Sequence, residues 1–134
     1  MQDYFEQLEV LKPSPDLSPQ QVISIQLESL QNNDLSRGDQ GMRICFRFAS
    51  PGNQVSTGPV EHFIEMLKSP LYRPMVGFER AEFSEVSRTG NIAQQTVRLV
   101  RGKGESAVFI FMLSRQMQEP YIGCWMTDAV LRVA

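Results

Sequence analysis

Asp128 is the residue of this sequence with the clearest potential for chemistry. It interrupts an apolar stretch, and strict strand alternation places it on the same face as Cys124, Met126 and Val130. A carboxylate on an apolar face must find a cation or change its pKa. We therefore expect a salt bridge from Asp128 to Arg43, Arg47 or Arg73, with a role as general base as the alternative.

His62 is the only histidine, so any imidazole chemistry near neutral pH depends on it. It lies on a short predicted helix whose apolar stripe is formed by its neighbours, and no acidic partner can be named for it. The two cysteines, Cys45 and Cys124, are far apart and match no metal-site spacing. We expect an exposed, inert His62, two buried thiols, a reducing compartment, and neither a metal nor a cofactor.

Charge and hydropathy narrow the classes of partner. The formal net charge is -2, and the lysines and arginines are scattered along the 134 residues, which predicts no nucleic-acid or anionic membrane surface. The start of the chain has no basic and apolar signal pattern, and no apolar run approaches the ~20 residues that span a bilayer. A cytoplasmic protein with no membrane association is expected.

The first half of the sequence has helical periodicity. The capping-box pattern Ser18-Pro19-Gln20-Gln21 begins a helix that runs to about residue 32, and Gln26 on its polar side is expected to be solvated. A second helix is expected over about residues 39–49, with the turn at 50–53 as its end. A third follows from the 57–59 turn, with Thr57 as its cap, to about residue 68.

Residues 1–17 are predicted to form an N-terminal arm ahead of a single domain spanning residues 18–134. Two prolines separate the arm from the first long helix, and its apolar residues share one helical face: Tyr4, Phe5, Leu8 and Leu11. This face packs on the chain's own domain or, alternatively, docks on a protein partner.

After residue 75 apolar residues recur at every second position, which is the pattern of a β-strand. Strands are expected from residue 75, with a phase slip typical of a β-bulge near residues 79–80, and then over 92–101, 106–114 and 121–133. Residues 107–113 are apolar on both faces, so the second face needs the N-terminal arm or a second copy of the chain. The expected fold is α+β, with three N-terminal helices packed on a curved, mainly four-stranded antiparallel sheet.

This order of elements, with Trp125 and Asp128 three residues apart in the last strand, resembles the NTF2-like (cystatin-like, SnoaL-like) α+β cone. More narrowly, residues 18–133 resemble the DUF4864 family through several short segments: residues 46–53, 57–59, 72–74 and 97–100, with Phe63 and Met66. The resemblance implies the cone fold and a ligand site at the open end of the cone. The sequence lacks the acid–base pair that catalytic members of the cone superfamily keep.

The residues expected to line the open end of the cone are Phe46, Ser50, Phe63, Tyr72, Arg73, Gln95, Phe109, Trp125 and Asp128. For the aromatic residues, packing in the core is the competing interpretation. We expect a non-catalytic binding or scaffolding module that forms a homodimer through its sheet. The alternative is an enzyme or a carrier of a small apolar ligand, with Tyr72, Gln95 and Asp128 as the polar groups of the cavity.

Overall fold

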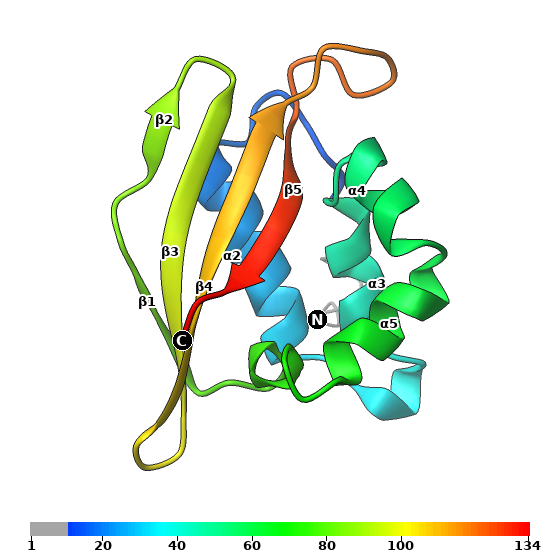
Figure 1. Ribbon diagram of the computed structural model, residues 1–134. Coiled ribbons are helices and arrows are strands. Elements are labelled where there is room, and N and C mark those ends of the chain that lie inside the picture. The colour runs from blue at the N-terminus through cyan, green and yellow to red at the C-terminus, as the bar shows by residue number, and fades with distance from the viewer. Residues whose placement is uncertain (1–10) are drawn as a thin grey trace, which may run out of the picture.

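The computed structural model describes residues 11–134, so the predicted docking face of Tyr4, Phe5 and Leu8 lies outside the described residues (Figure 1). The α-helices of this part are α2 (Pro19–Gln31), α3 (Gln40–Arg47), α4 (Pro51–Thr57) and α5 (Val60–Lys68). Two short 3₁₀ turns are η1 (Leu35–Arg37) and η2 (Arg73–Met75). The strands are β1 (Arg80–Phe83), β2 (Ser87–Thr89), β3 (Ile92–Arg101), β4 (Glu105–Arg115) and β5 (Trp125–Arg132).

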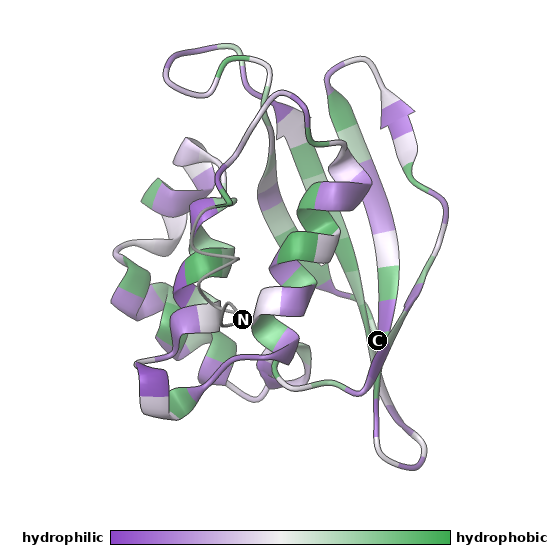
Figure 2. Ribbon diagram, turned by 180° about the vertical axis from the view of Figure 1, so that it is seen from behind, coloured by the Kyte–Doolittle hydropathy of each residue, from purple (hydrophilic) through white to green (hydrophobic). Residues whose placement is uncertain are grey.

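The first predicted helix is confirmed as α2. The Ser18 hydroxyl accepts a hydrogen bond from the Gln21 N–H, and the Gln21 side chain accepts one from the Ser18 N–H, which completes the capping box. Figures 1 and 2 show α2 lying across the inner face of the sheet. The side chains that it turns towards the strands are fully buried, each worth about 1.5–3 kcal/mol by removal from water: Val22, Ile23, Leu27 and Leu30.

The described chain has four α-helices in place of the three expected, because the predicted turn at residues 50–53 begins a helix. The Ser50 hydroxyl accepts a hydrogen bond from the Asn53 N–H, and Pro51 occupies the first helical position. A Ser-Pro pair ends one helix and begins the next equally well, since proline is favoured at the first helical position. Thr57 ends α4 and does not cap α5, whose N-cap is Pro59.

The strands form one open antiparallel sheet with the order β1-β3-β4-β5, and β2 pairs with β3 beyond β1. The predicted second and third strands are confirmed as β3 and β4. The expected strand from residue 75 begins later, at Arg80, because Met75 belongs to η2 and the chain then crosses to the sheet edge. The bulge predicted near residues 79–80 is wrong: Arg80 pairs regularly with Val100.

An irregularity in the last strand changes the predicted faces. Thr127 lies opposite Leu113 and Ala129 lies opposite Met112, so Asp128 is an extra residue without a partner on β4. Leu113 is buried on the inner face, whereas Met112 on the outer face is 36% exposed. The strand therefore changes phase at Asp128, and Thr127 and Ala129 point to opposite faces, whereas strict alternation would place them on the same face.

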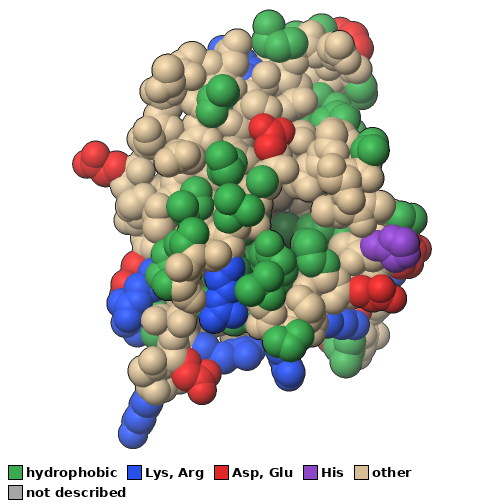
Figure 3. Space-filling model, viewed as in Figure 1, with side chains coloured by type: hydrophobic (Ala, Val, Ile, Leu, Met, Phe, Trp, Pro, Cys, Tyr) green, Lys and Arg blue, Asp and Glu red, His purple; other side chains and the backbone are tan. Residues whose placement is uncertain are grey.

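The two faces of the sheet are covered unequally by the described residues. The inner face of β4 is buried under the helices, whereas its outer face keeps Val108 and Ile110 half-buried. On β5, Leu131 of the outer face is 49% exposed. Figure 3 shows hydrophobic side chains gathered over β4 and β5 on this face. Leu11, by contrast, packs against the core.

A partly buried polar cluster holds the helices together at the start of α3. Lys68 Nζ, at the end of α5, lies 2.8 Å from the Asp39 carboxylate, and Asn33 Nδ2 donates to the same carboxylate at 3.1 Å. Burial raises the pKa of Asp39, but these hydrogen bonds and the charges of Lys68 and Arg43 outweigh burial and lower the pKa below its ordinary value. The carboxylate is therefore charged at neutral pH and joins α2, α3 and α5.

No helix within residues 11–134 has the length and apolar character needed to cross a bilayer.

Candidate functional site

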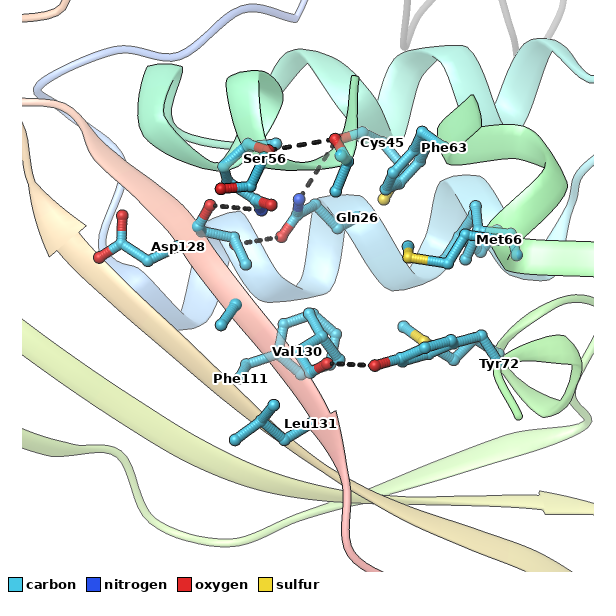
Figure 4. A pocket seen from close by; sticks show the side chains of 18 residues that line it. Gln26, Cys45, Ser56, Phe63, Met66, Tyr72, Phe111, Asp128, Val130 and Leu131 are labelled. Atoms are coloured by element: carbon cyan, nitrogen blue, oxygen red, sulfur yellow. Dashed lines mark hydrogen bonds between the residues drawn. The ribbon is translucent and has the colours of Figure 1, made fainter. Parts of the chain in front are cut away.

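A pocket of about 360 Å³ lies between the free edge of β5 and the helices. Figure 3 shows its opening as a hollow between hydrophobic side chains, and Figure 4 shows its lining from close by. The helices and the α3–α4 turn contribute Gln26, Leu30, Cys45, Ala49, Asn53, Ser56, Thr57, Phe63, Met66 and Leu67. The η2 region and the sheet contribute Tyr72, Met75, Phe111, Thr127, Asp128, Ala129, Val130 and Leu131. Most of these side chains are apolar, so the pocket favours an apolar ligand.

The inner wall of the pocket contains one buried polar cluster. Thr127 Oγ1 donates a hydrogen bond to Gln26 Oε1 at 2.6 Å, and Gln26 Nε2 donates to the Cys45 carbonyl at 3.2 Å. Gln26 is 3% exposed and Thr127 is 1% exposed, so the expectation of a solvated Gln26 is wrong. Gln26 lies four residues after Val22 and three after Ile23, and this spacing is the signal that places it on the buried stripe.

Cys45 lines the pocket but is poorly suited to act as a nucleophile. Burial raises the pKa of its thiol to about 12, although a hydrogen bond with Gln26 partly opposes that increase. The thiolate is the reactive form of cysteine, and a thiol with this pKa stays protonated at neutral pH. Cys45 therefore contributes shape and apolar surface to the pocket.

The edge of β5 forms one side of the opening. Above the opening, the Thr127 N–H donates to the Phe48 carbonyl and the Ser50 N–H donates to the Thr127 carbonyl, both at 2.8 Å. Below it, the Tyr72 hydroxyl donates to the Val130 carbonyl at 3.1 Å (Figure 4). The segment of edge between these two connections opens into the pocket, and the connections hold the helices at a set distance from the strand.

The Asp128 carboxylate does not point into the pocket. Its side chain is exposed and lies on the opposite side of β5 from Val130 (Figure 4). Within residues 11–134 it forms no ion pair, so the expected salt bridge to Arg43, Arg47 or Arg73 is absent. The bulge explains the difference, because it moves Asp128 out of the alternation that would have placed its carboxylate on a buried face.

Three of the nine residues predicted to line the cone line this pocket: Phe63, Tyr72 and Asp128. Gln95 lies elsewhere on the inner face, where Nε2 donates to the Ser84 carbonyl at 2.7 Å and to the side chain of Gln20. The predicted polar group of Tyr72, Gln95 and Asp128 is therefore not assembled at the pocket.

The other predicted residues have structural surroundings outside the pocket lining. Phe46 packs against Phe63 with ring centroids 5.2 Å apart, and Phe109 stacks on Tyr72 at 6.1 Å. Ser50 caps α4. Arg73 and Trp125 also lie outside the pocket lining.

Trp125 lies at the start of β5 and is 2% exposed. The guanidinium groups of Arg88 and Arg115 lie 4.9 Å and 5.4 Å from its ring centroid, which is the range of cation–π contacts. Trp125 does not line the pocket, and its contacts with Arg88 of β2 and Arg115 of β4 hold the start of β5 to these two strands.

Two further expectations concern ligating and titrating groups. His62 is exposed, as expected, and it does not contribute to the pocket lining. Among the described residues, no group of three or more His, Cys, Asp or Glu side chains is arranged to hold a metal ion.

Comparison with known proteins gives one match. Residues 14–132 match the model of a domain of unknown function, DUF4864. No curated protein and no solved structure matches the chain. The match covers helices α2–α5 and the five described strands completely, including every element that lines the pocket. The chain therefore belongs to the DUF4864 family.

Proposed function

We propose that this protein is a non-catalytic binding domain that holds a small, neutral, apolar molecule in the pocket beside β5. The observation that carries this proposal is the pocket itself, about 360 Å³ and lined mainly by apolar side chains. This volume lies near the lower end of the ~300–1,000 Å³ typical of ligand pockets. The expected ligand is therefore small.

The polar groups of the pocket support a neutral ligand. The ionisable side chains in its lining are Cys45, Tyr72 and Asp128. The Cys45 thiol is protonated, the Tyr72 hydroxyl is engaged by the Val130 carbonyl, and the Asp128 carboxylate points away. No pair of these groups is placed to move a proton between them and a substrate, which favours binding over catalysis.

The cone architecture of the NTF2-like superfamily is part of the same proposal. A helix layer against the inner face of an antiparallel sheet, with a pocket between them at one end, supports that placement. The chain has four α-helices and a five-stranded sheet in the described part, so the proposal concerns the architecture and not the number of elements.

Filling the pocket opening tests the proposed function. Ser56 is exposed and lines the opening, so Ser56→Trp should block it without disturbing the core. We expect the dissociation constant of a neutral fluorescent probe, N-phenyl-1-naphthylamine, to rise at least tenfold, on the order of 1.4 kcal/mol. Fluorescence titration measures this change.

Val55→Trp is the matched control for that variant. Val55 is the adjacent residue of α4, is 83% exposed and does not line the pocket. Its probe affinity should remain within about twofold of the parent protein, since a surface substitution away from the site changes little. Equal affinities of the two tryptophan variants, or no saturable binding by the parent protein, would refute a ligand site in this pocket.

We also propose that two copies associate through the outer face of the sheet. The supporting observation is that β4 is apolar on both faces, while in the described chain Met112 and Leu131 of the outer face remain 36% and 49% exposed. Small-angle scattering of the parent protein should give the mass of a dimer, and Met112→Lys should reduce it to that of a monomer. A monomer of the parent protein at ~100 µM, well above typical working concentrations for a stable dimer, would refute this association.

A further inference from the structure

A second concave region lies at the lower end of the sheet, next to η2. It is a groove of about 490 Å³, and three arginines that are distant in sequence meet there: Arg73 from η2, Arg101 from β3 and Arg132 from β5. Arg132 lies opposite Phe109 and Arg101 lies opposite Glu105 in the sheet register, so both arginines belong to its inner face. Figure 3 shows basic side chains gathered below the pocket opening, over this end of the strands.

Within residues 11–134 some cations pair with an acidic side chain, whereas the three arginines of the groove do not. Ion pairs join Arg37 to Asp34, Lys68 to Asp39, and both Arg80 and Arg98 to Glu82. Arg73, Arg101 and Arg132 make no ion pair with any Asp or Glu side chain of residues 11–134. The positive charge of the groove is therefore not neutralised by the surrounding described side chains.

Main-chain oxygens orient two of the guanidinium groups. Arg101 Nη2 donates to the Val76 carbonyl at 2.8 Å, and Arg132 Nη1 donates to the Leu71 carbonyl at 3.0 Å. Arg132 Nε donates to the main-chain oxygen of Ala134 at 3.1 Å. Each guanidinium has five N–H donors, so both groups keep free donors after these bonds. Holding an arginine in place before a ligand arrives lowers the entropy lost on binding.

One acidic residue also lines the groove. Glu105 makes no ion pair with the cations of the described chain, and it lies directly across the strand pair from Arg101. The groove thus contains three positive side chains and one negative side chain. The remaining lining includes Ser106, whose hydroxyl is a further donor.

We propose that this groove binds a phosphoryl group, carried either by free phosphate or by a small phosphate monoester. Guanidinium groups bind phosphate oxygens in pairs of parallel hydrogen bonds. Three guanidinium groups suit a phosphoryl dianion better than they suit a carboxylate, because a carboxylate has one negative charge and only two oxygens. The proposal does not depend on the apolar pocket: the two regions share no lining residue.

Calorimetric titration at constant ionic strength tests this proposal with three probes: inorganic phosphate, phenyl phosphate and acetate. Saturable binding of either phosphate probe, with weaker binding of acetate, supports a phosphoryl site. Tighter binding of phenyl phosphate than of phosphate identifies a monoester as the preferred source, and the reverse order identifies the free ion. Acetate binding as tight as both phosphate probes, or no saturable binding below ~10 mM, overturns the proposal.

Charge variants separate the groove from the general surface charge. Arg73 is exposed and its guanidinium forms no hydrogen bond to the described chain, so Arg73→Gln should fold normally and weaken phosphate binding roughly fivefold to tenfold. Arg80→Gln makes the same charge change on β1, outside the groove, and should alter the affinity less than twofold. Glu105→Gln should strengthen binding, because it removes the only negative side chain of the lining. Equal effects of Arg73→Gln and Arg80→Gln would overturn the assignment.

Discussion

Replacing Gly41 by alanine is expected to lower the free energy of unfolding by about 3 kcal/mol or more, at the upper end of the cost of overpacking a core. A Cβ atom at Gly41 would lie 2.0 Å from the main-chain oxygen of Ser29 and 2.9 Å from the Cα of Asn33. Both are main-chain atoms of α2 and its end, so no side-chain rotation relieves the clash. Urea unfolding followed by circular dichroism measures the loss.

Gly52→Ala is the matched control, because it makes the same change in a helix that has room for it. No atom lies within 4 Å of the position that a Cβ would occupy at Gly52. Alanine is favoured over glycine in helices by up to about 1 kcal/mol, so this variant should be as stable as the parent or slightly more stable. If both variants had the same urea midpoint of unfolding as the parent protein, the close packing of α2 against α3 at Gly41 would be refuted.

The crossing at Gly41 also bears on the pocket. Gln26 and Leu30 of α2 and Cys45 of α3 line its inner wall. If Gly41→Ala folds with α2 and α3 pushed apart, the wall should widen and the neutral probe should bind more weakly. The glycine thus links the packing of the helix layer to the shape of the candidate site.

Phe109→Ala is expected to cost about 3–5 kcal/mol, the usual range for removing a buried phenylalanine. Phe109 is fully buried at the centre of β4 and stacks on Tyr72. Its loss would leave a cavity that the surrounding strands cannot close without bending the sheet. For a domain of this size the thermal midpoint should fall by roughly 10–20 °C, which scanning calorimetry measures.

Phe83→Ala is the control for that substitution. Phe83 ends β1 and is 42% exposed, so the same truncation should cost only about 1 kcal/mol or less. Similar midpoints for the two variants would contradict the placement of Phe109 in the core. If Phe109→Ala kept the stability of the parent but no longer bound the neutral probe, the result would favour the ligand contact that the sequence analysis predicts for Phe109.

The elements that could be predicted from the sequence are those specified by local signals. The capping box at Ser18 and Gln21 begins α2 within its own first turn, and the alternation of apolar residues in β3 and β4 is set by the period of a strand. The α+β class follows from these elements and their order. The family resemblance, through residues 46–53 and 72–74, also agrees with the DUF4864 match.

Local patterns were insufficient where two signals conflicted or one residue changed the register. The Ser50-Pro51 pair is compatible with both the end of one helix and the start of another. In the structure it starts α4, and the Ser50 N–H donates to the carbonyl of Thr127, far along the chain. Alternation within β5 predicts a buried face for Asp128. The bulge that changes this face depends on how β5 pairs with β4, so the sequence of β5 alone does not reveal it.

The tertiary structure alone decided where the candidate sites lie. Gln26 and Thr127 are 101 residues apart in sequence and meet only because α2 crosses the sheet beside β5. The groove arginines, Arg73, Arg101 and Arg132, likewise belong to three separate elements. The sequence by itself determined α2, α3 and α5, most strands and the fold class, since these depend on neighbours within a few residues. The pocket and the groove depend on contacts between distant segments, which no local pattern specifies.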